Sequence, residues 1–447
     1  MKILMSAFSC GPGQGSEPGV GWNTAMAAAR LGHEVTVLTQ TEFRAQIERE
    51  IADGRVPENL KFDMFMPAWL ERVRDAGVKH GLSSMIWQPV SLVWQIYALT
   101  YARRNYRDAV FDLVHHVTFA QIRHPTLLTR LGRPTVLGPL GGADSAPMAL
   151  RKGFPWKEWT QELVRDLYNI ALRLDPITRR AFRDAAIIFL RTRAGLTAVP
   201  PRHRGKVQIW PGLAVSEIVG DETPARSAGE PLRLIYAGHL WYLKGVHLAI
   251  RALARARAQG VDVTLRIVGD GPAREDLRAL ARRLGLQPYI VWHGQVPRQK
   301  LLGLYARHHA FLFCSVRDAA PTVIVEAWAH GLPVICLAIG GPGEMVDASC
   351  GRAVATKQRS EDACVADVAA AIAEFAADEE LRLALGRGAK ARYRQSSWDR
   401  VMAALYAEIE TRLTLNAERV ARTSEWPSSF AFPQAAGKRR RMKRANL

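Results

Sequence analysis

The second half of the chain alternates between strand-like and helix-like segments with a regularity that few folds allow. Short apolar runs are each followed by a loop and a helical pattern; the runs lie at residues 232–238, 263–272, 289–294, 310–314 and 333–337. Parallel strands need a crossover connection, which is usually a helix, so this alternation is typical of a parallel sheet covered by helices. We therefore predict an α/β domain over residues 232–395.

The first half shows the same pattern less regularly. Strands are predicted at 2–6, 35–39, 112–117, 187–190 and 207–210, with a helix from about 22 to 31 and amphipathic, Arg-rich helices over 151–185. A chain of 447 residues is long enough for two domains of about 200 residues each. We predict a first domain over 1–211, a linker over 212–231, a helix over 396–414 that crosses back to the first domain, and a basic, disordered tail over 415–447.

Composition limits the environment and the partners. The five cysteines are odd in number and form no C-x-x-C pair, which favours a reducing compartment and argues against disulfides or a zinc site. No run of about 18 apolar residues is present, and the first residues are too soon polar for a signal peptide. The formal charge of +19 could attract nucleic acid, anionic lipid or anionic small ligands. We expect a cytoplasmic protein, with contact to the inner face of the membrane as one option.

The stretch 314–347 carries the strongest functional pattern. Pro321 suits the first turn of a helix and Gly331 suits the position just past its end. Asp318 precedes this helix, Glu326 follows eight residues later, and a loop, GGPGE, leaves the next strand at 340–344. Loops at the carboxyl ends of parallel strands line the ligand crevice, and a free helix N-terminus attracts phosphate. The stretch therefore predicts a site for a phosphate-bearing ligand.

These residues resemble a known family. An acid followed eight residues later by Glu, then Gly-Leu-Pro-Val and a GG-x-x-E loop, is similar to the donor-site signature of retaining glycosyltransferases of family 4. The resemblance implies the GT-B fold, in which two Rossmann-like domains with parallel sheets face each other across a cleft and the C-terminal one binds a nucleotide-sugar. Asp318-Ala319-Ala320 stands where the family usually has Glu, an aromatic residue and Gly.

The resemblance also implies roles for individual residues. Glu326 would bind the ribose hydroxyls and Asp318 would meet hydroxyls of the transferred sugar, which makes both candidate catalytic-site residues. Lys244 matches a lysine that grips the donor diphosphate, whereas His239 replaces the arginine of the family, so one fixed charge is lost or becomes pH-dependent. Backbone N–H groups would add to the diphosphate site at Gly340, Gly341 and Gly343.

The first domain offers weaker signals. Its first strand is followed by a glycine-rich loop, and glycine lets the backbone approach a ligand closely. The loop resembles the glycine-rich first loop of the same family, which implies that it borders the cleft through Gly13, Gly15, Ser16 and Gly19. An ordinary flexible turn is the alternative, and the loop lacks the acidic residue of an NAD site.

A catalytic histidine of the family has no counterpart at 138–142. The first candidate for this role is His116, followed by His115 and His124, and a structural role is equally open for each of them.

Aromatic and basic residues interleave over 66–108, and Trp94, Tyr97 and Tyr101 fall on one helical face. One interpretation is an interfacial surface that meets the membrane and a lipid-linked acceptor. The other, which we favour, is a core face beside a solvated basic face.

The resemblance implies a metal-independent, retaining hexosyltransferase that moves a hexose from a nucleotide-sugar to a polysaccharide or lipid-linked saccharide acceptor. No resident cofactor and no metal are expected, since the nucleotide-sugar is a substrate. One alternative is a sugar-nucleotide epimerase on the same fold. Another is a catalytically weak GT-B-like protein that binds anionic lipid or nucleic acid, of which nucleic acid is the less favoured partner.

Overall fold

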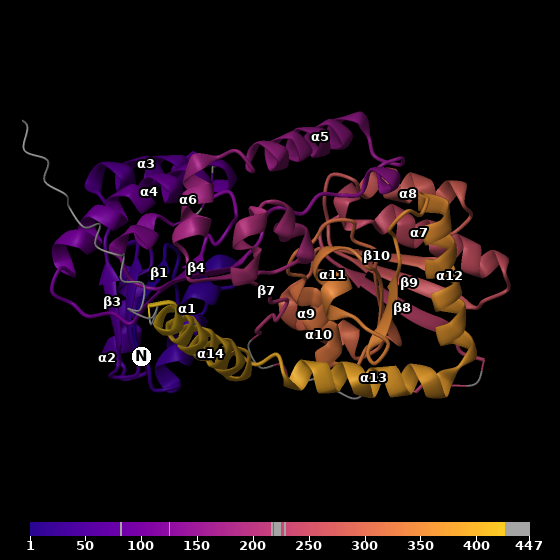
Figure 1. Cartoon of the computed structure of the whole chain (residues 1–447). Coiled ribbons are helices and arrows are strands. Elements are labelled where there is room, and N and C mark those ends of the chain that lie inside the picture. The colour runs from indigo at the N-terminus through magenta and orange to yellow at the C-terminus, as the bar shows by residue number, and fades with distance from the viewer. Residues whose placement is uncertain (81–82, 125, 216–217, 219–224, 228, 425–447) are drawn as a thin grey trace, which may run out of the picture.

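Two parallel β-sheets form the centres of two domains in the computed structural model, which describes residues 1–80, 83–124, 126–215, 218, 225–227 and 229–424 (Figure 1). The first sheet has the order β3-β2-β1-β4-β5-β6-β7. Its strands are β1 (Lys2–Ala7), β2 (Glu34–Thr39), β3 (Leu60–Met64), β4 (Leu113–Thr118), β5 (Thr135–Leu140), β6 (Ile187–Leu190) and β7 (Val207–Ile209). The second sheet has the order β10-β9-β8-β11-β12-β13. Its strands are β8 (Leu232–Ala237), β9 (Val263–Val268), β10 (Ile290–Gly294), β11 (Ala310–Phe313), β12 (Val334–Leu337) and β13 (Gly351–Val354).

Helices cover the sheets. The larger ones of the first domain are α1 (Ser16–Arg30), α2 (Arg44–Ala52), α3 (Ala68–Lys79), α4 (Ser83–Asn105), α5 (Trp156–Ala171) and α6 (Pro176–Asp184). Those of the second domain are α7 (Val246–Ala258), α8 (Arg274–Arg283), α9 (Arg298–Tyr305), α10 (Thr322–Ala329), α11 (Gly340–Met345), α12 (Glu361–Ala377) and α13 (Glu379–Arg394), and α14 (Trp398–Ser424) follows them. Single-turn helices include η1 (Leu127–Leu131), η3 (Arg193–Thr197) and η5 (Tyr242–Lys244).

The central strands are buried along their whole length because helices cover both of their faces. Strands β4, β6, β11 and β12 are buried at every position, as expected for parallel sheets inside α/β domains. In each sheet the strand order reverses beside the first strand, between β1 and β4 and between β8 and β11. Such a reversal leaves a crevice at the carboxyl ends of the two strands, and ligands of open α/β sheets bind there.

Helix α14 connects the two domains. It leaves the second domain after α13, crosses back and packs against α1 of the first domain (Figure 1). Arg30 Nη2 lies 2.8 Å from Asp399 Oδ1 at this contact. The predicted helix end at 414 is wrong, because α14 continues to Ser424 through a segment without proline or glycine. The rest of the predicted tail, 425–447, and residues 216–217, 219–224 and 228 of the predicted linker lie outside the described residues.

Two segments predicted as loops are helical. Helix α1 begins at Ser16, so Gly19 lies inside a helix and not in the first loop. A β-carbon on Gly19 would come within 2.1 Å of the Gln14 carbonyl oxygen, and one on Gly21 within 2.3 Å of that of Ser9. These glycines therefore serve close packing of α1 against the loop before it. Similarly, the GGPGE segment forms the short helix α11.

The aromatic stripe at 66–108 belongs largely to the core. Trp94 is fully buried, and its Nε1–H donates to the Phe65 carbonyl oxygen at 2.8 Å. The Tyr101 hydroxyl donates to Asp63 Oδ1 at 2.7 Å, whereas Tyr97 is exposed. The core interpretation is therefore correct for Trp94, and the three aromatic residues do not share one environment.

The composition led to predictions about the cysteines and about membrane-spanning segments. Each of the five cysteines is a buried, free thiol. Within the described ranges, no helix combines the length and the apolar character that crossing a bilayer requires.

Candidate active site

Two loops at the carboxyl ends of β8 and β11 bring the first pair of predicted residues together. Lys244 ends η5, which follows β8, and Asp318 follows β11. Lys244 Nζ lies 2.6 Å from Asp318 Oδ2, and the two side chains are only 22% and 15% exposed. The second carboxylate oxygen of Asp318, Oδ1, accepts from the Ala320 N–H at 3.1 Å. The ion pair holds the ammonium group at the crevice edge before any ligand binds.

Glycine at position 245 makes this approach possible. Gly245 has a left-handed φ of 66°, and a β-carbon there would lie 1.8 Å from the Cys314 carbonyl oxygen. The Val316 N–H also donates to the Leu243 carbonyl oxygen at 3.0 Å. The backbones of the two loops are therefore in direct contact, and this contact fixes the position of Lys244 relative to Asp318.

Glu326 lies in the middle of α10 and is 8% exposed. Its Oε1 accepts from Arg298 Nε at 3.1 Å, while Oε2 accepts no hydrogen bond from any residue that the structure describes. The nearby Tyr305 hydroxyl is buried, and burial, with the Glu326 charge as a second cause, raises the pKa of Tyr305 well above its usual value. Glu326 is thus a fixed carboxylate with one oxygen occupied and the other available.

The glycines of α11 pack against the Asp318 loop. Gly340 has a φ of 56°, and a β-carbon there would lie 2.4 Å from the Asp318 carbonyl oxygen. The Gly341 N–H donates to the same oxygen at 2.7 Å, and the Gly343 N–H donates to the Ile339 carbonyl oxygen at 3.4 Å. Two of the three amides predicted to bind phosphate are therefore already used within the protein.

A cavity of about 350 Å³ lies between the two domains. Ala320 and Thr322, at the start of α10, form one side of it, and Ser16 and Glu17 of α1 lie on the other. Ser16 has a positive φ of 54°, which is uncommon outside glycine. Of the predicted residues of the first loop, Ser16 lines the cavity, whereas Gly13 and Gly15 are exposed beside it and Gly19 is buried in α1.

The histidine prediction needs a correction. His116 is fully buried within β4, its Nδ1 lies 3.2 Å from Ser6 Oγ, and it does not line the cavity. Its neighbour His115 does line the cavity, because successive residues of a strand point to opposite faces. His115 has both nitrogens in hydrogen bonds, with the Gly138 carbonyl oxygen at 2.9 Å and the Tyr406 hydroxyl at 3.0 Å. His124 lies elsewhere, partly buried, with Nδ1 unpartnered among the described residues.

Comparison with known proteins identifies the second domain. Residues 222–392 match the family model of glycosyl transferases group 1. The second domain is therefore similar to the group 1 glycosyltransferases. The chain is 31% identical over 141 residues to the phosphatidylinositol N-acetylglucosaminyltransferase gpi3 subunit of Schizosaccharomyces pombe. The aligned segment covers 32% of this chain and 31% of that protein. It thus spans about a third of the length of the curated relatives it matches.

Solved structures of glycosyltransferases share the two-domain architecture. The lipopolysaccharide outer core galactosyltransferase WaaB in its apo form superposes with a TM-score of 0.59 at 13% identity, over 92% of this chain and all of that one. Anabaena Alr3699/HepE in complex with UDP gives a TM-score of 0.55 at 17% identity, with the same coverage. The predicted GT-B fold is confirmed.

Three residues of this candidate site were not predicted. Arg298 contacts Glu326, and Glu17 and Arg191 line the interdomain cavity. Glu17 Oε2 accepts from the Phe119 N–H at 2.8 Å, and burial raises the pKa of its carboxyl group. Glu17 is the one acidic residue in the glycine-rich stretch, a signal that could have identified it. Arg298 and Arg191 follow no recognisable motif, so only the fold reveals them.

His239 is exposed at the edge of the candidate site. Its ring stacks on that of Trp241 with centroids 5.3 Å apart. Both residues belong to the loop between β8 and η5 that also leads to Lys244. The fold therefore places His239 on the predicted loop, but it does not bring it to the Lys244–Asp318 pair.

The two histidines of β4 predict how the stability of the fold depends on pH. Burial lowers the pKa of His115 to about 4 and that of His116 to about 3, from 6.5. The unfolded chain therefore binds protons that the folded chain excludes between pH 6.5 and these values. Above pH 6.5 each histidine makes its full contribution to the free energy of unfolding. As the pH drops below 6.5, the free energy of unfolding falls by about 1.4 kcal/mol per pH unit for each such histidine.

Urea unfolding at a series of pH values measures this dependence. In the variant His116→Gln, the free energy of unfolding should fall less steeply with decreasing pH, by the contribution of one proton. The variant of the exposed residue, His80→Gln, controls for the loss of a histidine as such. A wild-type free energy of unfolding that stays constant from pH 6.5 to 4 would contradict the buried neutral state.

Proposed function

We propose that this protein is a retaining glycosyltransferase that moves a hexose from a nucleoside diphosphate sugar to a saccharide acceptor in the interdomain cleft. The observation that carries this proposal is the meeting of Lys244 with Asp318 at the crevice of a group 1 glycosyltransferase domain, next to a cavity that the first domain closes. Glu326, one helix away, supplies a second fixed carboxylate.

The donor would extend from Glu326 to Lys244. The free Oε2 of Glu326 can accept from both ribose hydroxyls through its two lone pairs, while Arg298 orients the carboxylate. The ammonium group of Lys244 can meet the diphosphate, with His239 nearby on the same loop. Asp318 holds Lys244 in place and presents oxygen acceptors to the hydroxyls of the sugar.

The reaction needs negative charge to be stabilised as the diphosphate leaves. A cation fixed before the reaction does this without reorganisation, and such preorganised groups contribute most in sites that exclude water. In the proposed step the bond from the anomeric carbon to the diphosphate oxygen breaks, and the acceptor oxygen bonds to the same face of the sugar. The leaving phosphate oxygen takes the proton of the acceptor hydroxyl, so no side chain of the protein is needed as a general base.

We infer that the acceptor enters from the first domain. The cavity wall formed by Ser16, Glu17, His115 and Arg191 is polar and can bind hydroxyl groups. WaaB acts, by its name, in the outer core of lipopolysaccharide, and the S. pombe relative acts on phosphatidylinositol. Both names favour a polysaccharide or lipid-linked saccharide as the acceptor class.

A thermal-shift screen of the purified protein against UDP-, GDP- and ADP-sugars tests the donor assignment. A true donor present at 100 times its dissociation constant should stabilise the fold by about 2.7 kcal/mol. NMR of the product then reports the anomeric configuration, and a chelator control should leave the rate unchanged if no metal takes part. If no nucleotide-sugar stabilises the protein, the proposal fails in favour of the catalytically weak alternative. Conversion of the donor sugar without any acceptor would favour the epimerase.

A further inference from the structure

Helix α5 is amphipathic in the reverse of the usual sense. Its charged residues Glu162, Arg165 and Asp166 face the protein, and the side chain of Glu162 is almost completely buried. Its apolar residues, by contrast, face solvent: Trp156 is 79% exposed, and the same face continues through Leu163, Val164, Leu167, Ile170 and the following Leu174, which is 74% exposed. A surface helix normally turns its apolar stripe toward the core. The outward stripe of α5 therefore needs an explanation of its own.

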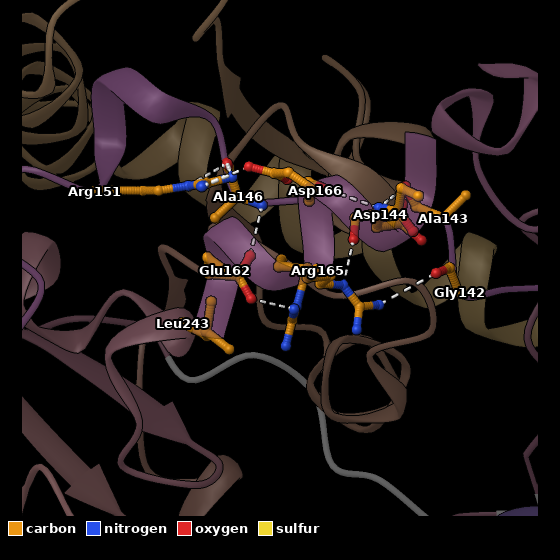
Figure 2. A network of polar contacts seen from close by, with 12 residues as sticks. Gly142, Ala143, Asp144, Ala146, Arg151, Glu162, Arg165, Asp166 and Leu243 are labelled. Atoms are coloured by element: carbon orange, nitrogen blue, oxygen red, sulfur yellow. Dashed lines mark hydrogen bonds and ion pairs between the residues drawn. The ribbon is translucent and has the colours of Figure 1, made fainter. Parts of the chain in front are cut away.

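Polar contacts fix this orientation (Figure 2). Glu162 Oε2 accepts from the Ala146 N–H at 3.1 Å, and Arg165 Nε donates to the Asp144 carbonyl oxygen at 2.8 Å. Asp166 Oδ2 pairs with Arg151 Nη1 at 2.7 Å. Turning the helix to bury its apolar stripe would leave these charges unpaired, which is costly for groups that are largely buried. The apolar face is thus held outward by the fold.

Further apolar residues are exposed on other elements of the first domain. Ile177 of α6 and Met148 are exposed close to α5 in the sequence, and Leu92 and Ile96 of α4 are exposed as well. Helix α4 packs against η1, which contacts α6, and α3 to α6 lie along one edge of the molecule in Figure 1. Single exposed apolar residues are common, but a contiguous patch marks an interaction surface.

Positive charge surrounds the stripe. The cationic residues at its ends form no ion pair within the part of the chain that the structure describes; they are Lys152, Lys157, Arg173 and Arg179. An apolar helical face with unpaired cations beside it matches the boundary between lipid headgroups and acyl chains. Anionic lipid adds about 1 kcal/mol for each basic residue near the surface. A second copy of this chain, which also carries a net charge of +19, would instead bring like charges together.

We propose that the outward face of α5 docks on an anionic lipid bilayer. The inward face then links the bilayer to the crevice, because Glu162 Oε1 also accepts a hydrogen bond from Arg317. Arg317 directly precedes Asp318 in the chain. A docked α5 would hold the loop of the Lys244–Asp318 pair at a fixed distance from the membrane, which suits an acceptor embedded in lipid.

Co-sedimentation of the full-length protein with vesicles tests the proposal. We expect binding to vesicles of phosphatidylcholine with phosphatidylglycerol, and much weaker binding to phosphatidylcholine alone. The triple substitution Leu163→Ser, Leu167→Ser and Leu174→Ser should reduce binding by about tenfold or more, since each leucine loses its burial in the bilayer. The matched control removes three exposed apolar residues elsewhere: Ile51→Ser, Val291→Ser and Leu415→Ser. Circular dichroism confirms that both variants fold.

A labelled variant gives a second readout. Because all five native cysteines are buried, Leu167→Cys can be labelled selectively with an environment-sensitive fluorophore. Its emission should shift to the blue with anionic vesicles, whereas the same label at Val291→Cys should not respond.

Two results would overturn the proposal. One is unchanged vesicle binding by the triple serine variant. The other is a dimer in sedimentation velocity that this variant dissociates, which would assign the stripe to a second copy. Vesicle binding needs neither donor nor turnover. A protein that does not bind vesicles can therefore still be a transferase, and a protein without transferase activity can still bind vesicles.

Discussion

Replacing Lys244 by alanine is expected to lower kcat by about 10²–10³, the usual cost of removing one preorganised group that stabilises transition-state charge. Lys244 is the cation that the structure fixes at the crevice through Asp318. Its loss has a second consequence. The Asp318 carboxylate, which is 15% exposed, would remain without its partner where the diphosphate is proposed to lie, and it would repel the donor. Initial rates at saturating donor measure the effect on kcat, and the donor titration measures the effect on KM.

Two further variants separate these contributions. Lys357→Ala removes an exposed lysine of the same domain and should leave both parameters unchanged. The double variant Lys244→Ala with Asp318→Asn removes both charges, so donor binding should partly recover while kcat stays low. An unchanged kcat in Lys244→Ala would exclude Lys244 from the chemistry, wherever the donor binds.

The second domain was predictable because its signals are local. Alternating apolar runs and helical patterns predict a parallel sheet, and the helix expected at 321–330 is observed as Thr322–Ala329. Pro321 and Gly331 mark its ends through their own backbone preferences. The carboxyl ends of neighbouring strands must meet at one edge of a sheet, so a prediction from sequence could also bring Lys244 close to Asp318.

The predictions from sequence were wrong at positions where tertiary contacts determine the local structure. Glycine is usually a sign of a loop, but Gly19 lies in α1 because the Gln14 carbonyl oxygen leaves no space for a side chain. The same holds for Gly340 and the Asp318 carbonyl oxygen. His116 was chosen over His115, although the two occupy opposite faces of β4 and only the strand register shows which one meets the cavity.

Helix α5 illustrates the same limit on a larger scale. Its amphipathic pattern is visible in the sequence, but the pattern alone would turn the apolar side inward. The partners that hold its polar side are Asp144 and Ala146, in the segment after β5, and Arg317, in the loop after β11. The sequence offered 66–108 as one option for a membrane surface and favoured a core face there. Trp94 is buried, and the most exposed apolar stripe lies on α5.

Replacing Glu326 by glutamine is expected to abolish transfer and to weaken nucleotide binding by about 10²–10⁴. Two ribose hydroxyls bound by a charged acceptor contribute about 1.5–3 kcal/mol each, and the amide of glutamine retains only part of this. The substitution keeps the shape of a side chain that is 8% exposed, so the fold should survive. The measurement is calorimetric titration with the nucleoside diphosphate that the donor screen selects.

A matched control and an altered ligand make this prediction specific. Glu374→Gln changes a carboxylate that likewise pairs with an arginine, Arg352, but lies on α12 away from the crevice; it should leave binding unchanged. A 2′,3′-dideoxy nucleotide lacks the hydroxyls in question, so wild type and Glu326→Gln should bind it equally. If the variant instead loses affinity for both nucleotides to the same extent, Glu326 acts by orienting Arg298 and not by binding the ribose. In that case Arg298→Ala should reproduce the whole effect, because the carboxylate would contribute only through that arginine.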